Sequence, residues 1–229
     1  MSLKLSKRLK QIDSMVKPGY THIWDCCCDH GFLGAALLSR QAAECIHFVD
    51  IVPELMTELD RKLERFFPHS ASAWETHCLD VKALPLDQYQ GRHLVIIAGV
   101  GGDLMVQFIH ALVQQYPDHS IDFLLCPVYR QFMVRHQLIE LNFSLKQEVL
   151  VEENQRFYEI LLVSSVSDGQ STISPFGDDI WKADTAGQAE VARRYLNKTI
   201  AHYQRIQRGS VDNVQPIIDG YQRVMIVEP

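Results

Sequence analysis

The feature that most constrains the fold is residues 22–34, H-I-W-D-C-C-C-D-H-G-F-L-G. The segment starts with a short apolar run that ends on the carboxylate of Asp25. A second carboxylate and a histidine follow at Asp29 and His30, before apolar residues at helical spacing. This order predicts a strand, a sharp turn and a helix, the unit at which an open α/β sheet binds a ligand. Packing alone explains two acids and a histidine in such a turn poorly, so the segment is a candidate ligand site.

The alternation of strands and helices continues along the chain. The predicted strands are 22–28, 44–50, 74–80, 93–98 and 121–126, and the predicted helices are 3–17, one ending near 42, one from Pro53, 103–116 and one after Pro127. Two more strands, 144–153 and 156–165, are separated by only two residues, which predicts an antiparallel hairpin. We therefore expect an α/β fold, a Rossmann-like, doubly wound and mostly parallel seven-stranded sheet.

The C-terminal part has a different pattern. A polar linker is predicted at 166–177, and a helix without proline from 178 to about 208. Its narrow apolar side suits a helical hairpin or a contact with a partner, and residues 211–229 predict a shorter returning helix. We expect two domains, 1–165 with the N-terminal helix, and 178–229 as a small coiled-coil-like helical domain.

The charge distribution leaves the kind of partner open. A net charge of −6 does not favour a nucleic-acid binder. Basic residues nevertheless gather near both ends of the chain, namely Lys4, Lys7, Arg8, Lys10 and Lys17, then Arg193, Arg194, Lys198, Arg205 and Arg208. Solvated helix faces explain such runs as well as a polyanionic partner does.

The apolar runs and the cysteines predict a cytoplasmic protein without a metal site. No run has the length of a membrane span, and the N-terminus lacks the apolar core of a signal peptide. The six cysteines show no C-x-x-C spacing, which predicts buried free thiols. Cys26, Cys27 and Cys28 are consecutive, so alternate thiols point to opposite faces of the strand and do not converge on one ion. The sequence predicts no particular oligomeric state.

The strand ends indicate the class of ligand. The first three predicted strands end on Asp25, Asp50 and Asp80, and such ends line the ligand crevice of a parallel sheet. A dinucleotide requires G-x-G-x-x-G here, and Asp29 would repel a pyrophosphate; a Walker motif is also absent. S-adenosylmethionine has no phosphate, and its sulfonium and ammonium groups favour nearby carboxylates. For each acid taken separately, the alternative to a ligand-binding role is an ordinary exposed charge at the end of a strand.

Four segments together resemble a known family. They are L-S-K-R-L at 5–9, D-C-C-C-D-H-G-F-L at 25–33, I-I-A-G-V-G-G at 96–102 and E-E-N-Q-R-F-Y-E-I at 152–160. In order and spacing, from about residue 3 to 164, the chain resembles TrmK, the bacterial tRNA (adenine-N1) methyltransferases that act on adenine 22. The resemblance implies a class I methyltransferase domain that uses S-adenosylmethionine, followed by a helical C-terminal domain, with tRNA as the partner.

The strand ends and the resemblance together predict the site residues. The predicted cofactor-binding residues are Asp25, Cys27, His30, Asp50, Ile51, Asp80, Val81, Ala98 and Gly99. The predicted catalytic residues are Asp29 and Tyr129, and the predicted substrate-binding residues are Gly101, Gly102, Pro127, Arg130, Lys7 and Arg8. Asp50 is expected at the ribose hydroxyls and Asp80 at the adenine amino group. Asp25 is expected to hold either the turn or, through water, the ammonium group.

Two departures from the family pattern bear on the function. Cys27 stands where the family has glycine, and Cys126-Pro127-Val128 replaces the family's Q-P-N. The second change removes two polar groups that would hold the target base. Three alternatives therefore stay open: a tRNA adenine methyltransferase, a methyltransferase for another substrate on the same scaffold, and a binding module that has lost catalysis.

For the first alternative, the residues suggest a mechanism. The sulfonium is an activated methyl donor, so the enzyme mainly has to align the acceptor with the S–CH3 bond. Adenine N1 has a free lone pair and needs no general base, and Asp29 would stabilise the growing positive charge. An unpaired or flipped base would stack on an aromatic side chain. Tyr129 is the candidate, with packing over the helix start as the alternative; His30 would bind the cofactor carboxylate or cap the helix.

Overall fold

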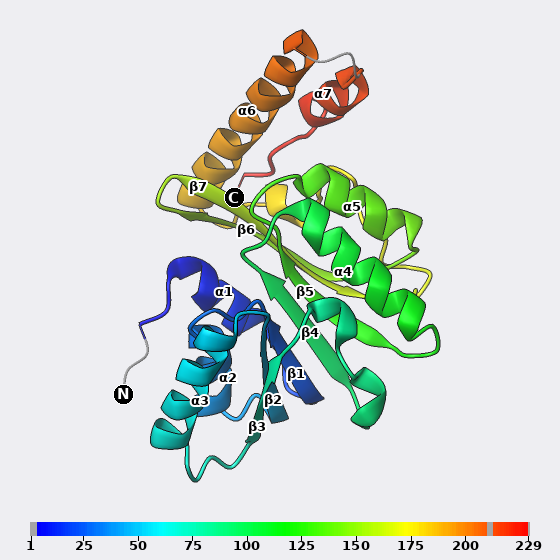
Figure 1. Ribbon diagram of the computed structural model, residues 1–229. Coiled ribbons are helices and arrows are strands. Elements are labelled where there is room, and N and C mark those ends of the chain that lie inside the picture. Colours follow the sequence, from blue (N-terminus) through cyan, green and yellow to red (C-terminus); the bar gives the residue numbers. More distant parts are fainter. Residues whose placement is uncertain (1–3, 210–212, 229) are drawn as a thin grey trace.

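The structure, a computed structural model, describes residues 4–209 and 213–228. It contains a seven-stranded sheet with the order β3-β2-β1-β4-β5-β7-β6 (Figure 1). The strands are β1 (Tyr20–Cys26), β2 (Ala43–Asp50), β3 (Ala73–Cys78), β4 (His93–Ala98), β5 (Ile121–Cys126), β6 (Ser144–Glu153) and β7 (Arg156–Ser164). Strand β7 pairs antiparallel with both β5 and β6, and the pairs among β1 to β5 are parallel. The predicted fold class is confirmed.

Helices cover both faces of this sheet (Figure 1). They are α1 (Lys7–Met15), α2 (Phe32–Ser39), α3 (Pro53–Phe66), α4 (Gly102–Gln115) and α5 (Gln131–Glu140), followed by α6 (Ala186–Gly209) and α7 (Gln215–Gln222). Strand side chains alternate between the faces, so Ile23 packs with the cluster of α1, α2 and α3, and Trp24 with that of α4 and α5. Short 3-10 turns lie at Val81–Ala83, Leu86–Gln88 and Asp179–Trp181.

The first helix is shorter than predicted. It begins at Lys7, because the hydroxyl of Ser6 accepts a hydrogen bond of 3.3 Å from the backbone N–H of Leu9 and caps the helix there. It ends at Met15 instead of residue 17, and residue 3 lies outside the described residues. The first and third strands also end two residues earlier than predicted, at Cys26 and Cys78.

The long C-terminal helix begins at Ala186 instead of residue 178. One oxygen of the Glu148 carboxylate accepts hydrogen bonds of 2.6 Å from the backbone N–H groups of Asp178 and Asp179. These bonds hold residues 179–181 in a 3-10 turn. The hydroxyl of Thr185 then accepts from the N–H of Gln188 at 3.2 Å, which sets the start of α6. A contact more than thirty residues away in sequence thus decides this boundary.

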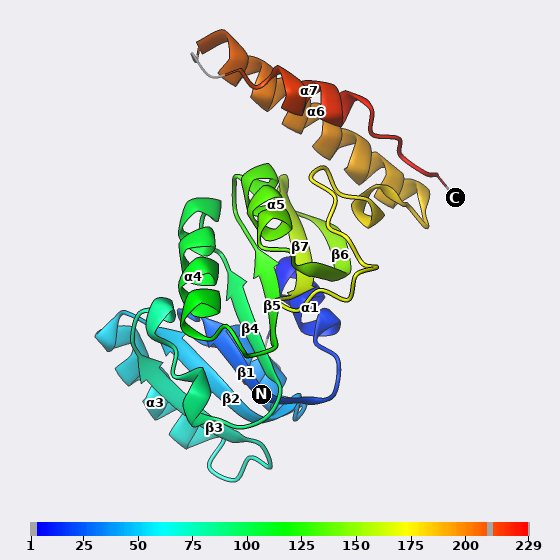
Figure 2. The ribbon, with the colours of Figure 1, turned by 90° about the vertical axis from the view of Figure 1, so that its right-hand side faces the viewer.

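Helices α6 and α7 lie side by side and project beyond the sheet (Figure 2). Their connection to the sheet is a buried ionic network centred on Arg135 of α5. Its guanidinium donates to Glu159 of β7 and Glu148 of β6 at 2.6 Å each, and all three side chains are fully buried. Tyr195 of α6 donates its hydroxyl hydrogen to the other oxygen of Glu159. The predicted linker lies beside this network, since the Ser174 carbonyl accepts from Arg135. The division into two domains stays a prediction.

The six cysteines are free thiols. Cys26, Cys45 and Cys126 are buried and Cys27 and Cys28 half-buried, whereas Cys78 is exposed because it ends the edge strand β3. Burial was therefore predicted wrongly for Cys78. Among the described residues, no helix is long and apolar enough to span a membrane.

Replacing Arg135 with methionine tests the buried network. The substitution would leave two carboxylates without their cation in a dry interior, so we expect the free energy of unfolding to fall by about 3–5 kcal/mol. Urea unfolding measures this change. Arg193→Met is the matched control, because the pairs of Arg193 with Glu190 and Glu228 are exposed to solvent, which screens them, so stability should change little. Equal losses in the two variants would contradict the assignment.

Candidate functional site

The turn between β1 and α2 has an unusual backbone conformation. Every second residue is left-handed, with φ of +55° at Cys27, +50° at Asp29 and +68° at Gly31. Glycine adopts such angles freely, aspartate adopts them more often than most residues, and cysteine does so at a cost of about 1–2 kcal/mol. Cys27 thus keeps the backbone conformation that glycine would favour at this position. The turn is fixed by hydrogen bonds from Cys28 N to Val49 O and from Gly31 N to Cys28 O.

Asp25 connects the end of β1 to the start of α2, on either side of this turn. Its carboxylate is buried and accepts a hydrogen bond of 2.8 Å from the backbone N–H of Gly34, in the first turn of α2. Gly34 is required there, because a Cβ would lie 2.3 Å from the ring of Phe48 and 2.9 Å from the Asp25 carboxylate. Burial raises the pKa of Asp25 to about 7, and the charge of Asp50 adds to the rise, although the Gly34 hydrogen bond opposes it. Of the two predicted roles for Asp25, this geometry favours holding the turn.

Asp50 connects the turn to the end of β2. One carboxylate oxygen accepts from the N–H of Asp29 and the other from the N–H of Val52, at 3.1 Å each. The next side chain, Ile51, is 64% exposed. An exposed apolar side chain beside a half-buried carboxylate offers one contact for a flat apolar ring and another for hydroxyl groups.

Asp80 lies just beyond the end of β3. Its carboxylate accepts a hydrogen bond of 2.9 Å from the N–H of Lys82 and caps the 3-10 turn that follows. Val81 is buried in the core on the α4 side of the sheet. Since β1, β2 and β3 are parallel neighbours, the three acids lie at the carboxyl ends of adjacent strands, on one edge of the sheet.

His30 lies exposed at the outer rim of the turn. Its Nε2 is 3.7 Å from the nearer carboxylate oxygen of Asp29. The N-cap residue of α2 is Gly31, which has no side chain, and His30 donates no hydrogen bond to α2 among the described residues. The helix-capping alternative for His30 is therefore wrong, and cofactor binding stays a prediction.

The ends of β4 and β5 bring a second group of predicted residues together. A Cβ on Gly101 would lie 2.2 Å from the ring of Tyr129, so this ring lies directly over the Gly101 backbone. Gly102 donates its N–H to the Tyr129 carbonyl at 3.1 Å, and Gly99, with φ of +91°, donates to Cys126. Tyr129 is 54% exposed. One face of its ring therefore packs on the Gly101 backbone, and the side chain remains accessible from solvent.

The residues next to Tyr129 and Gly99 differ in exposure. Pro127 is buried, whereas Arg130 is exposed and left-handed, with an ion pair of 2.8 Å to Asp103 in the first turn of α4. Ala98, the last residue of β4, is half-buried beside Gly99.

Arg8 of α1 reaches the same region. The carboxylate of Glu153 accepts hydrogen bonds from the backbone N–H groups of Lys7 and Arg8. The Arg8 guanidinium lies over the ring of Tyr158, and its Nη1 is 3.7 Å from where a Cβ on Gly99 would be. Its buried Nε has no hydrogen-bond partner among the described residues. Three of the four segments that carry the family resemblance therefore meet at Arg8, whereas Lys7 is exposed.

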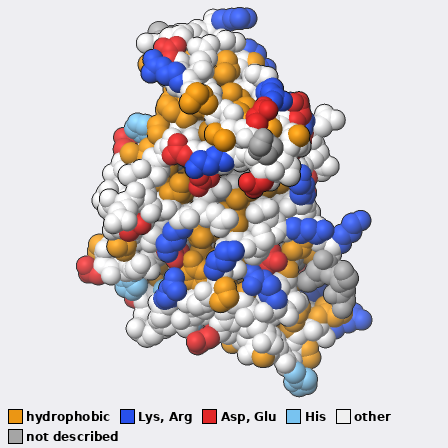
Figure 3. All heavy atoms as spheres, turned by 180° about the vertical axis from the view of Figure 1, so that it is seen from behind, with side chains coloured by type: hydrophobic (Ala, Val, Ile, Leu, Met, Phe, Trp, Pro, Cys, Tyr) orange, Lys and Arg blue, Asp and Glu red, His pale blue; other side chains and the backbone are white. Residues whose placement is uncertain are grey.

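A cleft of about 980 Å³ opens beside Tyr129. It lies between the start of α5, the start of β7 and the helices α6 and α7. Its lining includes the aromatic side chains of Tyr129, Phe157 and Tyr203 and the basic side chains of Arg130, Arg156, Lys198 and Arg205. Viewed from behind, basic side chains also lie on the projecting helices and on the body below them (Figure 3). Sequence reasoning missed the cleft, although the basic run 193–208 was a signal for it.

Asp25→Asn tests the buried carboxylate through pH. The folded-state pKa of about 7 exceeds the unfolded value of about 4. The folded protein therefore binds this proton more tightly, and the associated stability is present below about pH 4 and lost as the pH rises through about 7. Urea titrations of the ligand-free proteins give the free energy of unfolding at about pH 5 and at about pH 8. We expect its decrease between these two pH values to be about 2–3 kcal/mol smaller in Asp25→Asn than in the parent. Asp118→Asn, which is exposed, should retain the parent's slope; parallel slopes for all three proteins would contradict the assignment.

Comparison with known proteins bears directly on this geometry. A family model described as a methyltransferase domain matches residues 5–161. No curated protein sequence matches the chain. The matched range contains the turn after β1, all three strand-end acids, the Gly101–Tyr129 contact and Arg8.

Solved structures share the fold over nearly the whole chain. A Streptococcus pneumoniae protein, provisionally named a tRNA (m1A22) methyltransferase, has a TM-score of 0.75 at 20% identity and covers 96% of this chain and 97% of its own. TrmK of M. capricolum, solved with S-adenosyl-homocysteine, has a TM-score of 0.67 at 16% identity, with coverages of 95% and 93%. The B. subtilis m1A22 tRNA methyltransferase TrmK has a TM-score of 0.67 at 19% identity, with coverages of 96% and 95%. These likenesses confirm the expected fold, and because the family model spans more than half of the sequence, the chain belongs to the methyltransferase domain family.

Proposed function

We propose that the chain transfers the methyl group of S-adenosylmethionine to N1 of adenine 22 in tRNA, acting in the cytoplasm. The observation that carries the proposal is the adjacency of two surfaces. One is the acid-lined edge formed by the ends of β1, β2 and β3, and the other is the aromatic and basic cleft that begins at Tyr129, after β5. They are neighbours because β4 pairs with β1 on one side and with β5 on the other. A donor at the first surface and a base entering from the second would meet between Asp29 and Gly101.

The proposed cofactor fits the acid-lined edge chemically. A carboxylate has about four lone-pair sites, so Asp50 can accept ribose hydroxyls while keeping its bonds to Asp29 N and Val52 N. Ile51 would contact the adenine face, and Asp80 and the backbone of Val81 its edge, because the Val81 side chain is buried in the core. Negative charge along this edge favours a sulfonium and an ammonium group and disfavours a pyrophosphate. Similar proteins support the choice, since M. capricolum TrmK was solved with S-adenosyl-homocysteine and the S. pneumoniae protein with S-adenosyl-L-methionine.

The proposed chemistry needs alignment and charge stabilisation more than proton transfer. Adenine N1 attacks the methyl carbon with its lone pair while the S–C bond breaks, and the ring becomes cationic. The Asp29 side chain is 68% exposed, and it would stabilise that charge electrostatically. Stacking of the flipped base on Tyr129 would orient it, with an energy of about 1–3 kcal/mol. His30 and Cys27 would contact the cofactor from the turn.

The proposed tRNA contacts follow from the cleft. Its basic side chains would bind phosphates, and its aromatic side chains would stack on unpaired bases. The terminal Nη atoms of the Arg8 guanidinium lie next to Gly99 and are donors suited to an acceptor atom of the substrate. The overall charge of −6 does not oppose this binding, because the basic groups gather locally.

A second candidate function is methylation of another substrate on the same scaffold. Cys126-Pro127-Val128 replaces the polar Q-P-N of the family, which removes an amide donor and acceptor from the base pocket. A protein or small-molecule acceptor would not require those groups. The same experiment separates the two candidates.

Mass spectrometry of tRNA incubated with the protein and S-adenosylmethionine tests the proposal. We expect 1-methyladenosine at position 22, and about 100-fold to 1,000-fold slower transfer in Asp29→Asn, because the substitution removes the charge beside the transfer point. Asparagine suits the left-handed backbone at this position, so cofactor binding should persist in a thermal shift assay. Asp118→Asn, at the opposite end of the sheet, is the control. Cofactor binding without any methylated tRNA nucleoside would favour the second candidate.

Replacing Lys198 or Arg205 with glutamine tests the role of the cleft. Each substitution should weaken tRNA binding and lower the slope of log affinity against log salt concentration by about 1, because one phosphate contact is lost. Filter-binding titrations at several salt concentrations measure both quantities. Lys62→Gln on α3, outside the cleft, should change neither, and unchanged slopes in the cleft variants would exclude the cleft as the tRNA surface.

A further inference from the structure

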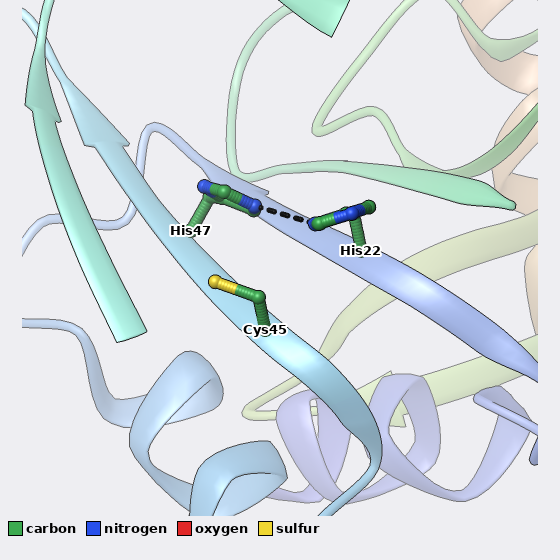
Figure 4. Close-up of side chains that lie close together, drawn as sticks. All are labelled: His22, Cys45 and His47. Carbon is green, nitrogen blue, oxygen red and sulfur yellow. Dashed lines mark hydrogen bonds between the residues drawn. The ribbon is translucent and has the colours of Figure 1, made fainter. Parts of the chain in front are cut away.

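A cluster of histidines occupies the α4 face of the sheet, away from the acid-lined edge. His22 is near the start of β1, and Cys45 and His47 alternate along β2, so all three side chains point to the same face. The register pairs His22 directly with Cys45. Figure 4 shows His22 and His47 facing each other, with the Cys45 side chain on the same side of the strands. Their ligating atoms, one from each residue, all lie within 4.8 Å of one another.

The distances suit a shared ion. Nδ1 of His22 lies 3.0 Å from Nε2 of His47, which is close to the separation of two nitrogens that bind one tetrahedral ion at about 2.0–2.1 Å each. A thiolate with two imidazoles is a donor set that favours zinc and related transition-metal ions over magnesium or calcium.

The hydrogen bonds around the cluster leave the two facing nitrogens available. Nε2 of His22 lies 3.2 Å from the Gln90 carbonyl, which only accepts, so this nitrogen carries the hydrogen. The lone pair on Nδ1 of His22 then faces Nε2 of His47 and can pass from that hydrogen bond to an ion. Nδ1 of His47 lies 2.9 Å from Nε2 of His77. Each imidazole therefore has a partner for its second nitrogen, which is how protein metal sites orient their histidine ligands.

Packing holds the ligands in place. The Trp24 ring stacks on His47 with centroids 3.8 Å apart and an angle of 10° between the planes. His47 is fully buried, Cys45 is buried and His22 is half-buried. The site thus has a dry, fixed interior side and one ligand within reach of solvent.

We propose that Nδ1 of His22, Sγ of Cys45 and Nε2 of His47 bind one divalent transition-metal ion of the zinc class, with water as the fourth ligand. His77 acts as the positioning residue for His47, which commits the other nitrogen of His47 to a hydrogen bond and limits the site to one ion. This inference does not depend on the proposed function, because the cluster lies on other parts of the sheet.

The hydrogen bonds indicate which protons move, and how many are released, when the ion binds. Without an ion, His77 donates through Nε2 to His47, and His47 donates through its own Nε2 to His22. When the ion binds, Nε2 of His47 becomes a ligand, and its proton moves to Nδ1 of the same ring. Nδ1 of His47 then donates to Nε2 of His77. The proton that Nε2 of His77 carried moves to Nδ1 of His77. The Cys45 thiol loses its proton to solvent as the thiolate–metal bond forms. One proton is released for each ion bound.

Titration of the full chain, purified with chelator, with Co²⁺ tests the site. We expect stoichiometric binding and a thiolate-to-cobalt charge-transfer absorption band, with zinc displacing cobalt. Cys45→Ser should lose this band, and His22→Gln should weaken binding by about 10-fold or more, as loss of one ligand does. Cys78→Ser and His110→Gln, which lie outside the cluster, are the matched controls and should behave like the parent.

Two measurements keep the test decisive. Thermal unfolding of metal-free Cys45→Ser shows whether that variant is folded, and proton release in weak buffer should equal the cobalt bound by the parent. Absence of the band in folded parent protein, or its persistence in Cys45→Ser, would overturn the proposal and leave a hydrogen-bonded histidine chain.

Discussion

The hydrogen bond between the buried carboxylate of Asp25 and the backbone N–H of Gly34 is the constraint on which the site depends. It fixes the start of α2 against the end of β1, and the left-handed residues between them must then span a short gap. Asp50 closes the same turn from the next strand by accepting the N–H of Asp29. The exposed Asp29 is thereby held by two carboxylates that have no direct part in the chemistry we propose.

A second buried interaction determines where the C-terminal helices lie. Arg135 neutralises Glu148 and Glu159, and each glutamate uses its remaining oxygen outside the sheet, Glu159 for Tyr195 and Glu148 for the backbone before α6. The cleft beside Tyr129 exists because these contacts hold α6 across the start of β7. One ionic group in the core of the sheet thus positions a surface that is far away in sequence.

The sequence predicted what local patterns encode. The hairpin was placed almost to the residue, because apolar alternation ends at Asn154 and Gln155, and both residues adopt the left-handed angles that a two-residue turn requires. The start of α6 was placed wrongly, since a carboxylate from β6 captures the preceding backbone. The histidine cluster escaped prediction for the same reason: only the strand register brings residue 22 beside residue 45. Local periodicity identifies faces, whereas register decides which residues meet on them.

Residues Cys126-Pro127-Val128, next to the proposed methyl-acceptor pocket, show the same difference between local sequence and tertiary contacts. Its backbone bonds are intact, because Cys126 O accepts from Gly99 and Val128 donates to Val100, so the shape of the turn does not depend on the missing amides. What changes is the polarity of the acceptor pocket that we propose. Arg8, brought in from α1, lies close enough to Cys126 to oppose the burial that raises its pKa to about 11. A guanidinium donates hydrogen bonds and accepts none, so the acceptor pocket that we propose beside Arg8 would favour acceptor atoms of the substrate.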